Sequence, residues 1–450
     1  MKTSALKYAV LTWISGISML ILLVMPFHAF LTVWLSSLIG HYTALRLWKE
    51  VLLVLTVIGA AYLLLTDHKI RYHTLSRRLV WVILAYIGLN VIWGLLALNQ
   101  HDVTLKALGY GLIVNLRCLI FFLITWSAAL RLARLRTNWQ WLVLVPAIGV
   151  VVIGLLQIFV LPHDFLRHFG YGDKTIPAIE TINHNTHYIR IMSTLRGANP
   201  LGAYMIIPIS LLTVLLIRNG RNWRQGLLLI ASVVVLFYSF SRSAWIGAVL
   251  SVLTILALSR LSAKTQKYAL VGVAATVLVV AGLALAFRNS QHFQNFVLHT
   301  QSHSAVKTTS NGGHLTALKS GLHDLVHSPL GDGPGTAGPA SFYNTGHPER
   351  VAENYFIQVG QETGWLGLVL FILINVGVGY LLFLRRDDPL ALSLFGALIG
   401  LTFVNLLSHA WTDDTLAYVW WGLAGVAMAP NPQIKGKAKD EPAKNRTAVR

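Results

Sequence analysis

Long apolar runs recur along almost the whole chain, and they constrain the fold more than any other feature. A helix of about 20 apolar residues crosses the roughly 30 Å hydrocarbon core of a bilayer. About twelve runs approach this length, at residues 8–27, 51–65, 79–98, 105–130, 141–161, 201–217, 226–238, 245–258, 268–287, 356–384, 390–407 and 415–429. Charged residues make up only 12% of the chain, about half the share in soluble domains. The sequence therefore predicts an all-α polytopic membrane protein with about twelve transmembrane helices.

The distribution of basic residues predicts the orientation of the chain. The formal net charge is +19, and the cytoplasmic loops of membrane proteins are enriched in Lys and Arg. If the N-terminus is cytoplasmic, every inner connection carries at least two basic residues, such as Lys69 and Arg71 in one and Arg385 and Arg386 in another. We therefore expect both termini in the cytoplasm, with 430–450 as a disordered basic tail. The high charge then requires no nucleic-acid partner.

The same topology divides the chain into membrane and outer parts. Residues 1–287 are expected to form the first nine spans, with an outer loop at about 162–200, and residues 356–429 the last three spans. Between them, 288–355 is predicted to be a large extracytoplasmic loop. Inside this loop an amphipathic helix is predicted at about 314–326, because four leucines recur at helical spacing, namely Leu315, Leu318, Leu322 and Leu325. The chemistry of the protein is expected in these outer segments.

Two arginines stand at the outer ends of neighbouring spans. Arg242 lies within "VVVLFYSFSRSAWIGAVLSVL", in a short outer hairpin, and Arg196 precedes the sixth span in "MSTLRGANPLGAYM". A guanidinium among apolar residues is costly unless it has a partner or a wet cavity. A guanidinium group can bind a phosphate through two parallel hydrogen bonds, and it stays charged at any working pH. The pair therefore predicts an anion site, and the alternative is an arginine that only orients a helix end.

Four motifs resemble the O-antigen ligase and O-antigen polymerase superfamily. They are, in chain order, "STLRGANPLGAY", "YSFSRSAWIG", "HSPLGDGPG" and "ENYFIQVGQETGWLG". Each is degenerate by itself, but the four occur in the family's order, on a similar bundle with a large outer loop before the last three spans. The resemblance covers roughly residues 190–370, and the first third of the chain matches only as hydrophobic spans.

This resemblance implies a GT-C-type glycosyltransferase fold in the cytoplasmic (inner) membrane of a bacterium. It implies transfer of a glycan from a polyprenyl diphosphate carrier to a glycan or glycolipid acceptor on the outer face of that membrane. It implies no cofactor, no nucleotide sugar and no required metal, with membrane lipids and other polysaccharide-assembly proteins as candidate partners. Arg196 and Arg242 would hold the diphosphate, whose negative charge increases as it leaves.

The chain departs from the ligase pattern at the position expected for the catalytic base. Ligases of the family carry a histidine followed by a small polar residue in the last motif, whereas this chain has Glu353 and Asn354 there. A carboxylate can also accept or orient the acceptor proton, so this difference favours a polymerase-like or divergent transferase. His347 is a rival base in "NTGHPER", and both His347 and Asn354 are candidate substrate-binding residues. The structural alternative for Glu353 is an acid that stabilises the N-terminus of the tenth span.

Further polar residues have both a functional and a structural interpretation. Glu362, nine residues after Glu353, either lines the cavity and orients the acceptor or is a hydrogen-bonded structural acid. Arg117 is a charge within the fourth span, and it either binds substrate or pairs with an acid on a neighbouring helix. Asp413 and Asp414, in "SHAWTDD", are interpreted as solvated loop acids more readily than as site residues.

Metal and nucleotide sites receive little support from the sequence. The chain has 17 histidines, including His184 with His187 and His323 with His327. However, no cluster of Cys, His and acidic residues has convincing ligand spacing. The segment "GDGPG" lacks the strand and helix that a phosphate-binding loop requires. We therefore expect no metal site.

Three classes of function follow from these observations. The first is an outer-face glycosyltransferase that uses a polyprenyl diphosphate donor. The second is a flippase or exporter of lipid-linked oligosaccharide, for which charged residues along a path through several spans would be expected. The third is a non-catalytic scaffold for envelope assembly, which would need no paired arginines facing a large outer loop. The position of the arginines favours the transferase.

Overall fold

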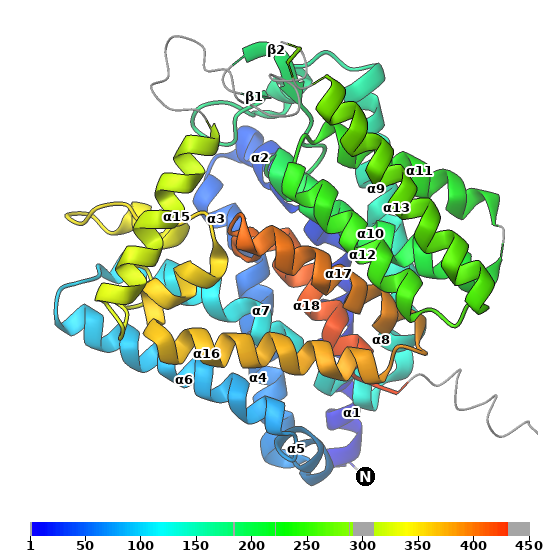
Figure 1. The fold of residues 1–450 in the computed structure, drawn as a ribbon. Helices are drawn as coiled ribbons and strands as arrows, with labels where there is room; N and C mark the ends of the chain where they lie inside the picture. The colour runs from blue at the N-terminus through cyan, green and yellow to red at the C-terminus, as the bar shows by residue number, and fades with distance from the viewer. Residues whose placement is uncertain (1, 183–184, 221, 288, 291–309, 431–450) are drawn as a thin grey trace, which may run out of the picture.

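The computed structural model describes residues 2–182, 185–220, 222–287, 289–290 and 310–430. The fold is a bundle of helices (Figure 1). Each expected span coincides with one main helix, namely α1 (Lys2–Val24), α4 (Trp48–Thr66), α6 (Arg78–Asn99), α7 (Leu105–Arg131), α9 (Trp139–Phe159), α10 (Ala198–Asn219), α11 (Trp223–Tyr238), α12 (Arg242–Leu258), α13 (Ala263–Ala286), α16 (Tyr355–Leu384), α17 (Pro389–Leu406) and α18 (Asp414–Ala427). The polytopic α-helical class is therefore confirmed.

By length and composition, fewer helices than the twelve expected spans qualify as membrane-crossing. Within the described residues, eight helical segments are long and apolar enough to cross a membrane. Helices α11 and α12 are apolar but shorter, and α18 has 14 residues. The count of twelve spans and the GT-C architecture therefore stay predictions.

Shorter elements connect these helices. They are η1 (Met25–Phe27), α2 (His28–Ile39), α3 (Tyr42–Arg46), α5 (His68–Leu75), α8 (Ala133–Thr137), η2 (Phe165–Phe169), β1 (Glu180–Ile182), β2 (Asn185–Arg190), α15 (Ser310–His327), η4 (Gly338–Tyr343) and η5 (Ala410–Thr412). The segment predicted as an amphipathic helix at 314–326 lies within α15, which is a few residues longer. The basic tail predicted at 430–450 lies outside the described residues except for Pro430.

Two features of the fold differ from the sequence prediction. The first apolar segment does not end at Phe27, because the helix continues as far as Ile39 through the short 3-10 turn η1. Pro26 occupies the first turn of η1, where a missing N–H is tolerated. In the predicted outer loop, β1 and β2 form an antiparallel hairpin with Glu180 opposite Arg190. An all-α description therefore misses the one sheet in the described part of the chain.

Close packing of α12 against α17 sets the geometry of the outer end. The two helices approach so closely that an added Cβ on Gly400 would collide with the backbone carbonyl of Gly247. Small residues allow this approach between membrane helices. Arg242 at the start of α12 therefore lies near Leu406 and Leu407 at the end of α17, and all three line the same cavity.

The loop segments fall into two groups, one at each end of the bundle. Segments expected in the cytoplasm pair with one another, because Arg131 lies 3.2 Å from Asp67 and Arg260 lies 2.5 Å from Asp387. At the opposite end, the 162–200 loop, the α11–α12 turn, α15 and the α17–α18 connection line common cavities. This grouping agrees with the predicted topology.

A cysteine placed at Lys319 tests which end faces outward. Lys319 is exposed on α15, whereas the single native cysteine, Cys118, is buried. In a Cys118→Ser background, we expect Lys319→Cys to react with a membrane-impermeant thiol reagent in intact spheroplasts. Ala133→Cys, exposed on α8 at the opposite end, is the control and should react only after lysis. Labelling of Ala133→Cys alone in intact spheroplasts would reverse the orientation.

Candidate functional site

Two adjoining cavities of about 510 and 340 Å³ lie at the predicted outer end of the bundle. Their lining comes from segments far apart in the sequence: the β-hairpin loop, the α11–α12 turn, the start of α16 and the α17–α18 connection. Helix α15 contributes Leu315 and Leu318 to the larger cavity. The residues shared by both cavities are Asn199, Ser241, Ser243, Glu353 and Ser408. The two cavities therefore form one composite site.

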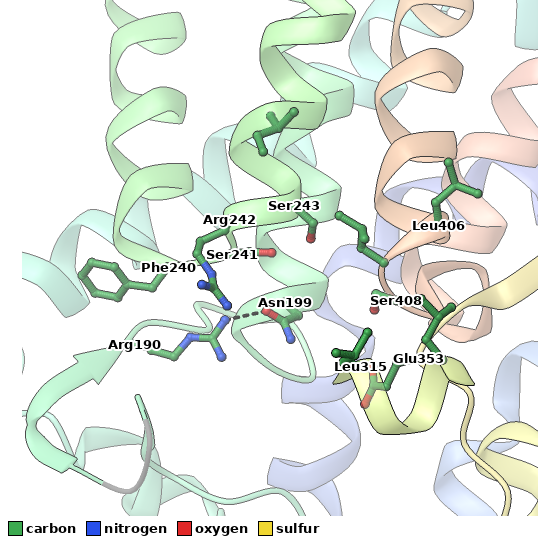
Figure 2. A pocket seen from close by; sticks show the side chains of 13 residues that line it. Arg190, Asn199, Phe240, Ser241, Arg242, Ser243, Leu315, Glu353, Leu406 and Ser408 are labelled. Atoms are coloured by element: carbon green, nitrogen blue, oxygen red, sulfur yellow. Dashed lines mark hydrogen bonds between the residues drawn. The ribbon is translucent and has the colours of Figure 1, made fainter. Parts of the chain in front are cut away.

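The tight α11–α12 turn directs Arg242 into the larger cavity. Phe240 adopts a left-handed backbone with φ of 51°, which is unusual for a bulky residue and marks a constrained turn. The Trp245 indole donates a hydrogen bond to the Leu236 carbonyl at 3.0 Å and closes the turn. Ser241 is the N-cap residue of α12, and Arg242 is its first residue. The cost of a guanidinium here is reduced because it faces a cavity (Figure 2).

Arg190 is a second cation of the larger cavity that sequence reasoning missed. It ends β2, and its Nε donates to the Ser239 carbonyl at 2.9 Å while a terminal nitrogen donates to Asn199 Oδ1 at 2.5 Å. Figure 2 shows Arg190 and Arg242 extending into the same space. The only sequence signal was an arginine six residues before Arg196, at the end of a short extended segment.

The electrostatics of the two arginines favour a bound anion. Burial lowers the pKa of Arg190, Glu180 at 3.9 Å opposes that change, and the positive charge of Arg242 lowers the pKa further. Burial also lowers the pKa of Arg242. A negative charge placed between the two guanidinium groups would stabilise the charged form of both. The larger cavity is therefore suited to an anionic group.

Arg196 lies in the smaller cavity, whereas Arg242 lies in the larger one. The pair expected from sequence is thus divided between adjoining cavities, and Arg190 is the direct neighbour of Arg242. Burial and the neighbouring Asp414 raise the pKa of Asp413, while its bond from the Leu416 N–H and the charge of Arg196 oppose that rise. Arg196 therefore lies in a mixed-charge environment with acidic as well as basic groups.

Glu353 lines both cavities and is the carboxylate at their junction. Its φ is 54°, so a non-glycine residue is held in the left-handed region, where strain often accompanies function. The next residue, Asn354, caps α16 by accepting a hydrogen bond from the Ile357 N–H at 3.1 Å. The ring of His409 lies 3.8 Å from the Glu353 carboxylate. This arrangement places a carboxylate where the two cavities meet and an imidazole of the smaller cavity beside it.

Asn354 and His347 lie outside the residues that line the two cavities. The Asn354 amide donates to the Leu406 carbonyl at 2.9 Å, so it ties the start of α16 to the end of α17. His347 is exposed on the loop before α16. The structure brings Glu353, Arg242 and Arg196 to the composite site and leaves these two predicted binding residues beside it.

Glu362 is buried inside α16 and holds the glycine-rich turn. Its two oxygens accept hydrogen bonds from the Asn115 amide at 2.7 Å and from the Gly335 N–H at 2.8 Å. Gly335 has φ of 96°, and a Cβ there would collide with the Ala107 carbonyl. The contacts fit the structural alternative for Glu362, and they explain "GDGPG" as a packed turn against α7.

Arg117 belongs to a buried ion cluster behind the smaller cavity. It lies 2.5 Å from Asp414 and 3.7 Å from Glu50, and it donates to the Thr412 carbonyl at 2.6 Å. Lys49 completes the cluster, 2.9 Å from Asp414 and 3.0 Å from Glu50. The contacts fit the alternative of an arginine paired with acids on neighbouring helices. The interpretation of Asp413 and Asp414 as solvated acids was wrong, since both are buried.

Removing the charge of Asp414 is expected to destabilise the protein severely. Asp414→Asn leaves Lys49 and Arg117 buried with only Glu50 as an anion, and breaking a buried ion pair from one side costs about 3–5 kcal/mol. We expect a large loss of folded protein in detergent, measured by thermal unfolding and by yield in size-exclusion chromatography. Asp164→Asn is the control, because Asp164 is half exposed and its pair with Arg167 spans 3.9 Å. Equal stability of both variants would contradict the proposed importance of the cluster.

Metal-ligating residues do not gather in the part of the chain that the structure describes. No group of three or more His, Cys, Asp or Glu there could hold a metal ion. His323 and His327 stack on α15 with ring centroids 3.9 Å apart. His184 lies outside the described residues.

Two comparisons with known proteins agree with the motifs. Residues 226–372, which include Arg242 and Glu353, match the O-antigen ligase family. The chain is also similar to an O-antigen polymerase of Salmonella muenchen, with 26% identity over 229 residues. That match covers 50% of this chain and 55% of the relative, so it spans about half the relative's length. Both findings confirm the resemblance to the O-antigen ligase and polymerase superfamily.

Proposed function

We propose that this relative of the O-antigen ligases and polymerases is a glycosyltransferase that moves a glycan from a polyprenyl diphosphate carrier to an acceptor sugar. The reaction would take place at the outer face of the bacterial cytoplasmic membrane. One observation carries the proposal: Arg190 and Arg242 line one cavity, and Glu353 lines both that cavity and its neighbour. An anion site and a carboxylate at the junction are what a diphosphate donor and a hydroxyl acceptor require.

The larger cavity is suited to the donor. Besides its two arginines, its lining includes Leu315, Leu318 and Leu407. Guanidinium groups bind diphosphate oxygens through paired hydrogen bonds, while leucines can contact the isoprenoid chain next to the diphosphate. The amphipathic helix α15 thus supplies an apolar wall beside a cationic one.

The smaller cavity is suited to the acceptor. Its lining is polar and of mixed charge, including Arg196, Glu180, Ser408 and Asp413. Such groups can donate and accept hydrogen bonds with sugar hydroxyls. Glu353 lies where the two cavities meet, so an acceptor hydroxyl in the smaller cavity would approach a donor in the larger one.

The arrangement supports the following proposed reaction. The acceptor oxygen forms a bond to the anomeric carbon of the donor glycan, and the bond from that carbon to the diphosphate oxygen breaks. The leaving diphosphate takes the electron pair, and Arg190 and Arg242 stabilise the increased negative charge. The hydroxyl proton goes to the Glu353 carboxylate, with His409 beside it to orient that group. The proposed reaction uses no nucleotide sugar, cofactor or metal.

A polymerase-like acceptor is favoured over a lipid A-core acceptor. Glu353 replaces the histidine expected in ligases, and the curated relative is an O-antigen polymerase. We propose that the acceptor is a further glycan chain. In this account the protein has its N- and C-termini in the cytoplasm and works beside other polysaccharide-assembly proteins.

Reconstitution tests the function. Proteoliposomes with a polyprenyl diphosphate-linked oligosaccharide should yield one free polyprenyl diphosphate for each new glycosidic bond, measured by chromatography and mass spectrometry. A flippase would move the intact donor across the bilayer without releasing diphosphate, and a scaffold would do neither. Either outcome would overturn the transferase assignment.

A further inference from the structure

A third cavity lies at the opposite end of the bundle, at the predicted cytoplasmic side. Its volume is about 110 Å³. Five helices, α1, α4, α5, α6 and α7, contribute to the lining, which includes Leu11, Ala60, Ile70, Thr74, Leu84 and Ser127. Its two polar members, Thr74 and Ser127, lie 3.5 Å apart, within reach of a mutual hydrogen bond. The cavity therefore offers an almost wholly apolar surface.

The short helix α5 closes the cytoplasmic end of this cavity. It connects α4 to α6, and Figure 1 shows it beneath both, near the N-terminus. Ile70 is buried and lines the cavity, and Asp67 caps α5 by accepting hydrogen bonds from two backbone N–H groups. Leu84 on α6 also lines the cavity but is 38% exposed. The cavity thus meets the lipid-facing surface of α6.

Basic side chains surround the closed end. Lys7 lies one helical turn before Leu11 on α1, and its ammonium donates to the Thr66 carbonyl at 2.6 Å. Arg131 lies one turn beyond Ser127 on α7. Four exposed basic residues belong to α5 and its junction with α6, namely Lys69, Arg71, Arg77 and Arg78. An apolar cavity therefore lies directly next to a strongly basic surface.

Some cations of the predicted cytoplasmic connections pair with acidic residues. Arg136 pairs with Asp388, and Arg260 pairs with Asp387. Among the described residues, no ion pair joins an acidic group to Lys69 or Arg71, nor to Lys264 or Lys267 of α13, and the nearby Asp67 pairs with Arg131. Lys69 and Arg71 differ from the α13 lysines because Ile70, which lies between them in the chain, lines the apolar cavity. Orienting the chain in the membrane does not require basic residues to gather beside a cavity. An anionic ligand would supply the negative charge that Lys69 and Arg71 lack among the described residues.

We propose that this cavity and α5 together bind one anionic phospholipid of the inner leaflet. One acyl chain would enter between α4 and α6 and fill the apolar cavity, where its methylene groups gain contacts that an empty space lacks. The phosphate would lie against the basic residues of α5, which attract anionic lipid. The site is separate from the outer cavities and does not depend on the proposed transfer reaction.

Native mass spectrometry of the full chain from nanodiscs tests this site. The nanodiscs contain equal amounts of phosphatidylglycerol and phosphatidylcholine with identical acyl chains. We expect one phosphatidylglycerol to be retained in preference to phosphatidylcholine. The double variant Lys69→Gln and Arg71→Gln should reduce that preference by on the order of tenfold. The matched control is Lys264→Gln with Lys267→Gln, at the predicted cytoplasmic start of α13, and it should leave the preference unchanged.

A cavity-filling variant separates the acyl-chain site from the head-group site. Ala60→Phe places a ring in the cavity and should reduce retention of both lipids. Thermal unfolding in detergent shows whether the variant is folded, and Ala60→Leu provides a smaller filling group if it is not. Equal retention of the two lipids by the native chain would overturn the proposal. So would equal losses of preference in the α5 and α13 variants, or full lipid retention by folded cavity-filled protein.

Discussion

Glu353→Gln is expected to reduce glycan transfer by about a hundredfold to ten-thousandfold, the usual loss when a general base is removed. Glutamine keeps the size and shape of the side chain but cannot take the acceptor proton. Donor binding should survive, because Arg190 and Arg242 hold the diphosphate. Single-turnover release of polyprenyl diphosphate in proteoliposomes measures the chemical step separately from binding. The control is Glu349→Gln, an exposed glutamate on the same outer segment.

Two further variants distinguish the candidate bases. Glu353→His restores the residue type expected in ligases and should keep part of the activity. His347→Ala should be nearly as active as the native chain, because His347 is exposed and lies outside the cavity lining. If Glu353→Gln is fully active and His347→Ala is inactive, the assignment of the base is wrong. If both are fully active, the site works by positioning and by stabilising the leaving diphosphate alone.

Arg242→Ala and Arg190→Ala are each expected to slow transfer by about a hundredfold to a thousandfold, the typical loss of one stabilising donor in a transition state. Donor affinity should fall as well, because the cation contacts the diphosphate before and during reaction. Lysine should restore only part of the activity at either position, since an ammonium lacks the planar fork of donors. At position 190 the recovery should be smaller, because Arg190 also holds Ser239 and Asn199.

A matched control separates loss of the site from loss of positive charge. Arg167 lies in the 162–200 loop, as Arg190 does, but its side chain is 66% exposed and it lines neither outer cavity. Arg167→Ala should therefore retain native transfer. Folded yield and thermal unfolding must stay close to native values in all three alanine variants. Full activity of Arg242→Ala in folded protein would remove that residue from the diphosphate site.

The main helices, and the position of Arg242 and Glu353 beside the outer cavities, could be predicted because their signals are local. Each apolar run is continuous in the sequence, and its helix follows directly. Arg242 and Glu353 stand out because each lies within a recognisable motif at the end of a span. The predicted leucine face of α15 also matches in part, since Leu315 and Leu318 line the larger cavity and Leu325 is buried.

The remaining contacts depend on tertiary structure. Arg190 enters the site because the β-hairpin folds back and Ser239 accepts its hydrogen bond, and nothing local predicts either event. Glu362 and Asn115 are 247 residues apart in the chain. An intramembrane acid or arginine signals that a partner exists but does not identify it. For this reason the sequence left two interpretations open for Glu362 and Arg117.

The most direct test of the account is the position of a bound donor. Cryo-electron microscopy of the full chain in nanodiscs, with a non-cleavable phosphonate analogue of the polyprenyl diphosphate-linked glycan, would locate it. We predict phosphorus density between the guanidinium groups of Arg190 and Arg242, with the anomeric carbon directed toward Glu353. Density for the diphosphate beside Arg117, or elsewhere outside the larger cavity, would contradict the proposed site.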